Sequence, residues 1–252
     1  MQNHTDKIKT IDHIDIIMVG TTHSGNIGAA ARAMHNMCFT RLVLVDPQCP
    51  LDETAYARSS GAHSLLDQCK IVATLQEAVA DCHLVLGLTA RHRSLPWPQL
   101  DLQQVSQRLV NSPAGARAAL VFGREHSGLT NQELMHCHYS VSIPSNPAFS
   151  SLNVASAIQV ICYEIYQKLL LSRHLNDKPH EPNEPLAKAG DLEGYFTHLE
   201  QVLVATEFMD TDNPGLLMQR LRRLYLRAGM SLVEVNILRG ILNAVKKYRQ
   251  VV

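Results

Sequence analysis

The chain has 252 residues, 46% of them hydrophobic, which is enough for one large domain or for a domain of roughly 150 to 175 residues with an appendage. Residues 1–15 are polar and lack an apolar signal-peptide core, and no stretch approaches the ~18 uncharged apolar residues that cross a bilayer. Composition therefore excludes a membrane-spanning protein, and we expect a soluble, cytoplasmic one. The six cysteines form no Cys-x-x-Cys pair, so we expect free thiols.

The balance of 23 basic and 23 acidic residues hides a segregation of charge along the chain. Residues 174–213 carry nine acids and two lysines, a net charge of −7, whereas residues 214–252 carry eight bases and one acid, a net charge of +7. A basic terminal segment of this kind indicates a polyanionic partner.

Short apolar runs rich in β-branched residues alternate with helical patterns over the first part of the chain. The runs that we predict as buried parallel strands are residues 14–19, 42–45, 84–88, 118–122 and 141–143. The helical patterns between them are residues 26–38, 75–82, 102–110 and 131–137. This alternation predicts a doubly wound α/β domain with a parallel sheet.

The second part of the chain is predicted to be helical. Residues 151–173 form a long helix that is apolar on most of its circumference, so its own sheet or a second subunit must cover it. Residues 174–190 contain three prolines among charged residues, which is typical of a linker. We therefore predict a domain over residues 1–173, a linker over 174–190 and a small helical module over 191–252.

The helical module is predicted to contain three helices, at residues 191–209, from Pro214 onward, and at 231–249. The second helix is expected to bury Leu217, Leu221 and Leu224. The third is expected to bury one stripe, made of Ile237, Leu238, Ile241, Leu242 and Val245.

Three loops that carry glycine or asparagine follow predicted strands, at residues 25–28, 122–125 and 150–153. Because ligands bind at the carboxyl edge of an open parallel sheet, we expect these loops to form one pocket, as in an enzyme. The first loop lacks the Gly-Lys-Ser/Thr of a nucleotide-triphosphate loop. A dinucleotide site remains an alternative, because Asp46 stands where a ribose-binding acid would, although the glycines do not have the G-x-G-x-x-G spacing.

The same loops carry a family resemblance. Three motifs resemble those of the SPOUT class of RNA methyltransferases, namely Asn26-x-Gly28-x-x-x-Arg32, Phe122-Gly123-Arg124-Glu125-x-x-Gly128-Leu129, and Ile143-Pro144 with Ser151-Leu152-Asn153. Nearly the whole chain, including residues 90–98 and 236–240, is similar to the members that methylate the ribose 2'-hydroxyl of nucleotide 32 in the tRNA anticodon loop. The resemblance implies a parallel sheet with a C-terminal trefoil knot, an obligate homodimer and S-adenosylmethionine as the methyl donor.

The resemblance also places the cofactor contacts along the chain. They fall on Leu88, Thr89, Ala90, Gly123, Glu125, Gly128, Ile143, Ser150, Ser151 and Leu152. Leu88, Ile143 and Leu152 would supply apolar walls for adenine, and Gly123 would allow close backbone approach. Leu88 departs from the class, in which a hydroxyl residue is expected, but a contact through backbone atoms survives that change.

Catalysis at the 2'-hydroxyl is tied by the resemblance to Arg32, in a pocket assembled across the dimer. Methyl transfer from a sulfonium is an in-line displacement, so positioning supplies most of the acceleration. Because a guanidinium keeps its proton, we expect Arg32 to orient a phosphate or to stabilise the forming alkoxide. Ser151 and Asn153 can hydrogen-bond the hydroxyl or the cofactor, although both are also ordinary helix-starting residues.

Contacts with RNA are expected from basic residues in three places, namely Arg91 and Arg93 in the loop before Trp97, Arg124 in the second motif, and Arg220, Arg223 and Arg227 on one face of a tail helix. Trp97 is either a platform on which a base stacks or a half-buried structural residue.

Histidine and cysteine neighbours such as His136, Cys137 and His138 lack a second pair at zinc spacing, so we expect no metal. Two alternatives to the methyltransferase remain open. One is a catalytically idle RNA-binding protein with the same pocket, and the other is an NAD-dependent dehydrogenase.

Overall fold

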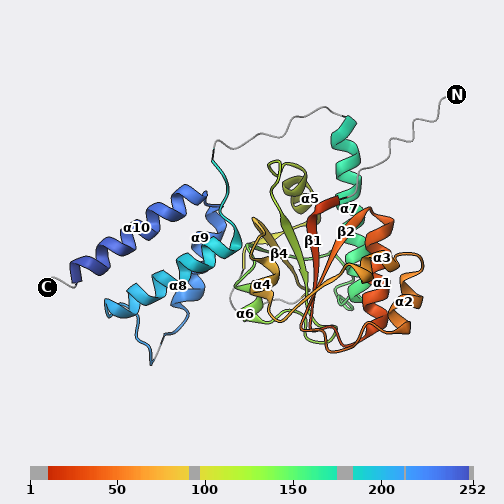
Figure 1. The fold of residues 1–252 in the computed structure, drawn as a ribbon, viewed down its shortest axis with the longest axis horizontal. Helices are drawn as coiled ribbons and strands as arrows, with labels where there is room; N and C mark the ends of the chain where they lie inside the picture. Colours follow the sequence, from red (N-terminus) through yellow and green to blue (C-terminus); the bar gives the residue numbers. More distant parts are fainter. Residues whose placement is uncertain (1–10, 91–96, 175–183, 213, 250–252) are drawn as a thin grey trace.

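A parallel β-sheet forms the centre of the computed structural model, which describes residues 11–90, 97–174, 184–212 and 214–249 (Figure 1). Its strands are Ile11–Val19 (β1), Phe39–Val45 (β2), Lys70–Val72 (β3), Leu84–Leu88 (β4), Gln99–Leu100 (β5), Ala118–Phe122 (β6) and Tyr139–Val141 (β7). Their order across the sheet is β3-β2-β1-β6-β4-β7-β5, and each pairing is parallel. The predicted α/β class is confirmed.

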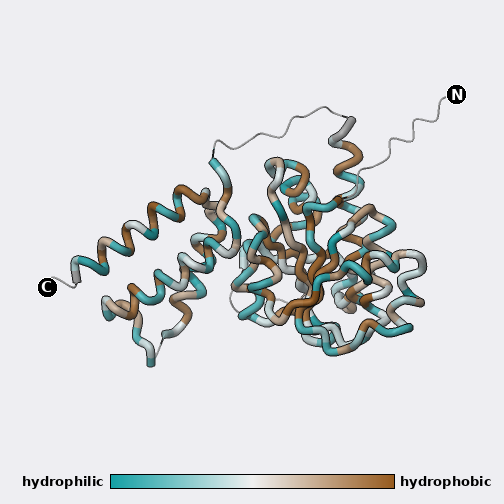
Figure 2. The backbone as a smooth tube through the Cα atoms, in the orientation of Figure 1, coloured by the Kyte–Doolittle hydropathy of each residue, from teal (hydrophilic) through white to brown (hydrophobic). Residues whose placement is uncertain are grey.

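Helices cover both faces of the sheet. In this part of the chain they are Ser24–Asn36 (α1), Glu53–Ser59 (α2), His63–Asp67 (α3), Leu75–Val79 (α4), Leu102–Val110 (α5), Asn131–Leu134 (α6) and Val154–His174 (α7). Alternate side chains of β1 point to opposite faces, so Ile16 and Met18 pack with α1, α5 and α7, whereas Ile17 and Val19 pack with α4 and α6. Figure 2 shows the apolar residues concentrated in these central strands.

Helix α7 is long and apolar enough, by length and composition alone, to cross a bilayer, a feature that the sequence pattern did not lead us to expect. Its Ile158, Ile161 and Ile165 are fully buried in the core that α7 shares with α1 and α5. On the other side of the same helix Tyr163 is 50% exposed and Leu171 is 58% exposed. The sheet domain therefore covers one face of α7 and leaves another face apolar and open.

The C-terminal module packs its helices Ala189–Ala205 (α8), Leu217–Ala228 (α9) and Leu232–Arg249 (α10) around a separate core. Tyr195 and Phe196 of α8 are almost completely buried there, against Leu226 of α9 and Val235 of α10. In Figure 1 the module lies beside the α4 and α6 side of the sheet domain.

Several predicted boundaries and faces differ from the structure. Strands β3 and β5 and helices α2 and α3 were not predicted, and α9 begins at Leu217, three residues after Pro214. The expected stripes of α9 and α10 were partly wrong, because Leu224, Ile237 and Ile241 are 49%, 58% and 54% exposed. Within the segment predicted as a linker, Ala187 is 3% exposed and belongs to the core of the module.

Candidate active site

The second motif is joined to the first through the side chain of Glu125. Its carboxylate accepts hydrogen bonds from the backbone N–H of Thr22 at 3.3 Å, the Thr22 hydroxyl at 3.1 Å and Asn26 Nδ2 at 3.0 Å. Burial opposes the ionisation of Glu125, but these donors outweigh it and lower the pKa of its carboxyl. An ionised Glu125 therefore fixes the second motif to the first.

Asn153 attaches the third motif to the same network. Its Nδ2 donates to Asn26 Oδ1 at 3.1 Å, and its Oδ1 accepts from the backbone N–H of Ala155 at 2.9 Å. The second bond caps α7, so the helix begins at Val154 and not at Ser151 as predicted. Asn153 thus starts the helix and orients the motif at the same time.

A cavity of about 350 Å³ lies at the carboxyl ends of β4, β6 and β7. All ten residues predicted to contact a cofactor line it, namely Leu88, Thr89, Ala90, Gly123, Glu125, Gly128, Ile143, Ser150, Ser151 and Leu152. Leu88, Val141 and Val154 also contribute apolar side chains from the core, so one wall is dry. Its size is typical of a small-molecule site.

The sequence did not indicate several residues of this cavity, namely His126, Val141, Val154 and Ala157. Phe122, which begins the second motif, also lines the cavity, although it was not among the expected cofactor contacts. Val141 is the last residue of its strand, so a position at a strand end near a motif was the available signal.

The cavity depends on a close backbone approach at Gly123. A Cβ placed on Gly123 would lie 2.1 Å from the carbonyl carbon of Gly128 and 2.2 Å from the N of Leu129. Since real Cβ atoms do not approach backbone so closely, only glycine allows the second motif to fold back on itself here. Gly28 has the same function on α1, where a Cβ would lie 2.0 Å from the Ala55 carbonyl oxygen.

A more open hollow of about 600 Å³ adjoins the network on its other side. It is lined by the start of α1, by Asn153, by Cys49 and Asp52 of the segment leading into α2, and by Arg58 of α2 itself. The first motif therefore faces this hollow and not the cavity, so the expectation that all three loops line a single pocket is only partly met. The hydrogen bonds of Asn26 nevertheless join the two spaces.

The predicted catalytic Arg32 lies outside both spaces. It is exposed on α1, six residues beyond Asn26, about 9 Å further along the helix axis. Ser151 does line the cavity and is exposed. Within one chain the structure therefore brings Ser151 and Asn153 to the site and leaves Arg32 on the surface.

The residues predicted to contact RNA are found in different environments. Arg91 and Arg93 lie outside the described residues. Arg124 packs over Gly20 and its Nη1 lies 2.9 Å from Glu133 Oε1, so its charge is already paired. On α9, Arg220 and Arg227 are exposed and Arg223 is half-buried.

The position of Trp97 favours its structural interpretation. Trp97 is half-buried, donates from Nε1 to the Cys137 carbonyl oxygen at 2.9 Å and packs against the core of the C-terminal module.

The dinucleotide alternative does not agree with the structure. Asp46 lines neither the cavity nor the adjoining hollow. In addition, β6 lies between β1 and β4, whereas in a dinucleotide-binding fold the first and fourth strands are neighbours.

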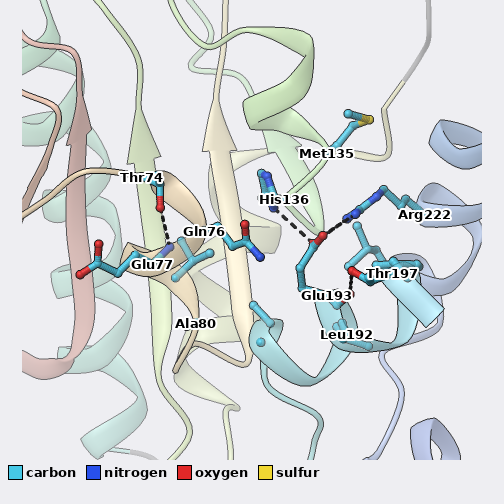
Figure 3. Close-up of a pocket in the computed structure, with 16 residues that line it drawn as sticks. Thr74, Gln76, Glu77, Ala80, Met135, His136, Leu192, Glu193, Thr197 and Arg222 are labelled. Atoms are coloured by element: carbon cyan, nitrogen blue, oxygen red, sulfur yellow. Dashed lines mark hydrogen bonds and ion pairs between the residues drawn. The ribbon is translucent and has the colours of Figure 1, made fainter. Parts of the chain in front are cut away.

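Another cavity, of about 440 Å³, lies between the sheet domain and the C-terminal module (Figure 3). Three of its charged or polar side chains interact with one another, because the carboxylate of Glu193 faces both Arg222 and His136. None of the residues of the three motifs lines it. We therefore assign the candidate active site to the cavity of about 350 Å³ at the carboxyl edge of the sheet.

Among the described residues, no group of three or more His, Cys, Asp or Glu side chains is arranged to hold a metal ion.

A parallel sheet with hydrogen-bonded motif loops around a cavity at its carboxyl edge is the architecture that the SPOUT resemblance predicts. The model of the SpoU rRNA methylase family matches residues 13–163. The chain therefore belongs to the SpoU methylase family. A second family model, for the C-terminal domain of the tRNA methyltransferase TrmJ, matches residues 190–251.

Relatives named TrmJ match the chain over nearly its whole length. The tRNA (cytidine/uridine/adenosine-2'-O-)-methyltransferase TrmJ of Pseudomonas aeruginosa is 46% identical, over 94% of this chain and 95% of the relative. The tRNA (cytidine/uridine-2'-O-)-methyltransferase TrmJ of Escherichia coli K12 is 45% identical, over 94% and 96%. The crystal structure of TrmJ from Z. mobilis ZM4 has a TM-score of 0.79 and 31% identity, covering 92% of this chain and 98% of that one.

Proposed function

We propose that this chain is an S-adenosylmethionine-dependent tRNA methyltransferase that modifies the ribose 2'-hydroxyl of cytidine or uridine at position 32 of the anticodon loop. The observation that carries the proposal is the Glu125–Asn26–Asn153 network beside a cavity lined by all ten expected cofactor contacts. The 45% identity to relatives described as tRNA 2'-O-methyltransferases supports the reaction and the substrate.

The residues of the cavity fit S-adenosylmethionine. Apolar side chains of Leu88, Ile143 and Leu152 suit adenine, and the exposed Ser150 and Ser151 can hydrogen-bond polar groups of the cofactor. When bound, S-adenosylmethionine supplies a methyl group on a positively charged sulfur. The protein's contribution is to hold the ribose oxygen in line with that carbon and to exclude water from the dry wall of the cavity.

A second subunit completes the proposed site. Arg32 lies outside the cavity of its own chain, and an open apolar strip beside the site includes Phe149, Leu152, Val160 and Tyr163, which are 78%, 39%, 38% and 50% exposed. A homodimer that covers this strip brings one chain's Arg32 toward its partner's cavity, where the guanidinium orients a phosphate or stabilises the developing alkoxide. The family also implies that the chain threads a trefoil knot at this edge.

The proposed organisation assigns residues 1–173 to catalysis, residues 174–190 to the connection and residues 191–252 to holding tRNA. The enzyme acts in the cytoplasm on soluble tRNA, without a metal. The excess of bases over residues 214–252 supports the role of the tail.

The test of the function is transfer of a radiolabelled methyl group from S-adenosylmethionine to unmodified tRNA by the full chain. We expect label in tRNA, and in the ribose of nucleotide 32 after nuclease digestion and mass spectrometry. Tight binding of tRNA without any transfer would instead favour the catalytically idle RNA-binding protein. Calorimetry with each ligand separates the methyltransferase from the dehydrogenase. A methyltransferase binds S-adenosylmethionine and not NAD, whereas a dehydrogenase binds NAD.

A further inference from the structure

The sheet domain and the C-terminal module meet at a polar seam around the start of α8. The backbone N–H of Ala189 donates to the Cys82 carbonyl oxygen at 2.8 Å, and that of Gly190 donates to the Ala80 carbonyl oxygen at 3.0 Å. Gly190 approaches so closely that a Cβ on it would lie 3.1 Å from the oxygen of Ala80. These contacts come from adjacent residues, so by themselves they fix the position of the helix start and leave the direction of its axis to contacts further along, among them those of Trp97 and Glu193.

One turn further along α8, the side chain of Glu193 reaches both modules (Figure 3). Arg222 of α9 donates to its two carboxylate oxygens at 2.7 and 2.5 Å. His136, in the turn after α6 of the sheet domain, places Nδ1 3.5 Å from Glu193 Oε2. The guanidinium of Arg222 also lies over the ring of Phe196, 4.6 Å from its centroid.

The three charged or polar side chains are largely shielded from water, since Glu193, Arg222 and His136 are 17%, 14% and 24% exposed. Burial opposes the ionisation of Glu193, but the bonds from Arg222 and His136 outweigh it and lower the pKa of its carboxyl to about 2. A shielded bidentate pair of this kind has a fixed geometry, unlike an exposed surface pair.

The direction of α8 determines where the basic residues of the module lie. With 17 residues, α8 is about 25 Å long, so a rotation of about 15° at its start displaces its far end by about 6 Å. Helices α9 and α10 pack on α8 and move with it, and α9 carries Arg220 and Arg227. A displacement of that size removes a side chain from hydrogen-bond reach of a phosphate.

We propose that Glu193 is a positioning residue for the tRNA substrate, which sets the angle of the C-terminal module on the sheet domain by joining Arg222 to His136. The proposal rests on the proposed function for its substrate, but the docking that it describes is measurable without any reaction.

Trp97 provides the probe for this docking. It is the single tryptophan of the chain, and it packs against the core of the module while Nε1 donates to the Cys137 carbonyl oxygen of the sheet domain. Its fluorescence emission therefore reports whether the module stays in place.

The experiment compares Glu193→Gln with Glu200→Gln in the full chain. Glu200 is an exposed residue of α8 two turns further on, so it provides the same charge change away from the seam. We expect Glu193→Gln to shift Trp97 emission to the red and to raise the KM for tRNA by about tenfold, because it leaves Arg222 without its shielded partner. The kcat and the Kd for S-adenosylmethionine stay within about twofold of the parent values, and Glu200→Gln changes none of these quantities.

A second variant protects the test against misfolding of the module. His136→Gln alters only the sheet domain's side of the contact, and we expect the same red shift and rise in KM, with no further rise when it is combined with Glu193→Gln. The proposal would be overturned if Glu193→Gln had the same Trp97 emission and the same KM for tRNA as Glu200→Gln. A KM for tRNA in His136→Gln equal to that of the parent chain would also overturn it. If the parent chain transfers no methyl group, the proposed function fails, while Trp97 emission and the Kd for tRNA still decide the role of Glu193.

Discussion

Gly123 makes a close backbone approach in the wall of the cavity, and its replacement gives a sharp test. Because a Cβ would lie 2.1 Å from the Gly128 carbonyl carbon, Gly123→Ala forces the second motif apart. We expect the affinity for S-adenosylmethionine, measured by calorimetry, to fall by at least about tenfold. Gly240→Ala is the control, since no atom lies within 4 Å of the Cβ it would add. Unchanged affinity in Gly123→Ala would show that the cavity is not the cofactor site.

Arg32 is expected to affect the reaction and not the cofactor. It is exposed on α1 and lines neither space of its own chain. We predict that Arg32→Ala lowers kcat by about 10² to 10³-fold, as for the loss of one donor to a developing oxyanion, and leaves the Kd for S-adenosylmethionine within about twofold. Single-turnover methylation and calorimetry measure the two quantities. Equal losses in both would mean that Arg32 is a structural residue.

The ten residues expected to contact the cofactor do line one cavity, because their spacing and strand-end positions are local properties, whereas Arg32 does not reach it. The contacts between motifs were not predictable. Asn153 and Asn26 are 127 positions apart, and nothing in either motif indicates that one amide donates to the other. Arg58 was also missed, since it lies in a helix that the sequence pattern did not predict and reaches the hollow only because Gly25 leaves room for it.

At the scale of elements, β7 is attached to the sheet partly through His138, whose protonation opposes folding. The side chain is 5% exposed, and its Nδ1 accepts from the backbone N–H of Val85 on β4 at 3.0 Å. Burial is the main cause that lowers the pKa of this imidazole to about 4. An unfolded histidine has a pKa near ~6.5, so the unfolded state binds the extra proton between these values. The contribution of neutral His138 to the free energy of unfolding is therefore fully present above about pH 6.5, and it is lost as the pH decreases toward 4.

The prediction compares the parent chain with His138→Asn in urea unfolding at several pH values. The asparagine Oδ1 can still accept from Val85 but does not titrate. We expect the parent to lose up to about 3 kcal/mol between pH 6.5 and 4 through this group, and the variant to have a shallower dependence. Burial also lowers the pKa of His13 and His83, so some slope remains in the variant. Equal slopes would exclude His138 as a source.

Long apolar elements were predicted better than short ones. The core strands β4 and β6 and helix α5 have the predicted bounds, because the strands are continuous apolar runs and the helix has a clear apolar period. Strands β3 and β5 have three and two residues, too few for any period to appear. The stripe on α10 was partly wrong for a different reason, since Leu238 and Leu242 pack in the core of the module with Val235, while Ile237 and Ile241 remain exposed.

At the scale of the whole molecule, the opposite charges of the two tail segments partly neutralise one another. Arg222 belongs to the basic segment and Glu193 to the acidic one, and the structure pairs them. The count of charges along the chain predicted a basic terminal segment, but it could not predict which of its bases pair with acids of the same chain. That depends on how α8 and α9 pack.

The three arginines that the sequence assigns to an RNA-facing side of α9 give a prediction about tRNA binding. Charge reversal of Arg220, Arg223 and Arg227 to Glu should weaken binding to tRNA and reduce the slope of log K against log salt by about 0.7 to 0.9 for each phosphate that the tail no longer neutralises. Filter binding over a series of salt concentrations measures both. Lys70→Glu, on the exposed edge strand β3, is the control for a change of net charge. Unchanged affinity and slope in the triple variant would remove the tail from the RNA interface.

We propose that loops distant in sequence form one methyl-donor site at the carboxyl edge of the sheet. A crystal structure of the full chain with S-adenosylmethionine would locate the cofactor. We predict the cofactor in the 350 Å³ cavity, with adenine between Leu88, Ile143 and Leu152 and the methyl carbon directed toward the hollow beside Asn153. Cofactor density in the cavity between the modules, or a methyl carbon directed into the core, would contradict the account.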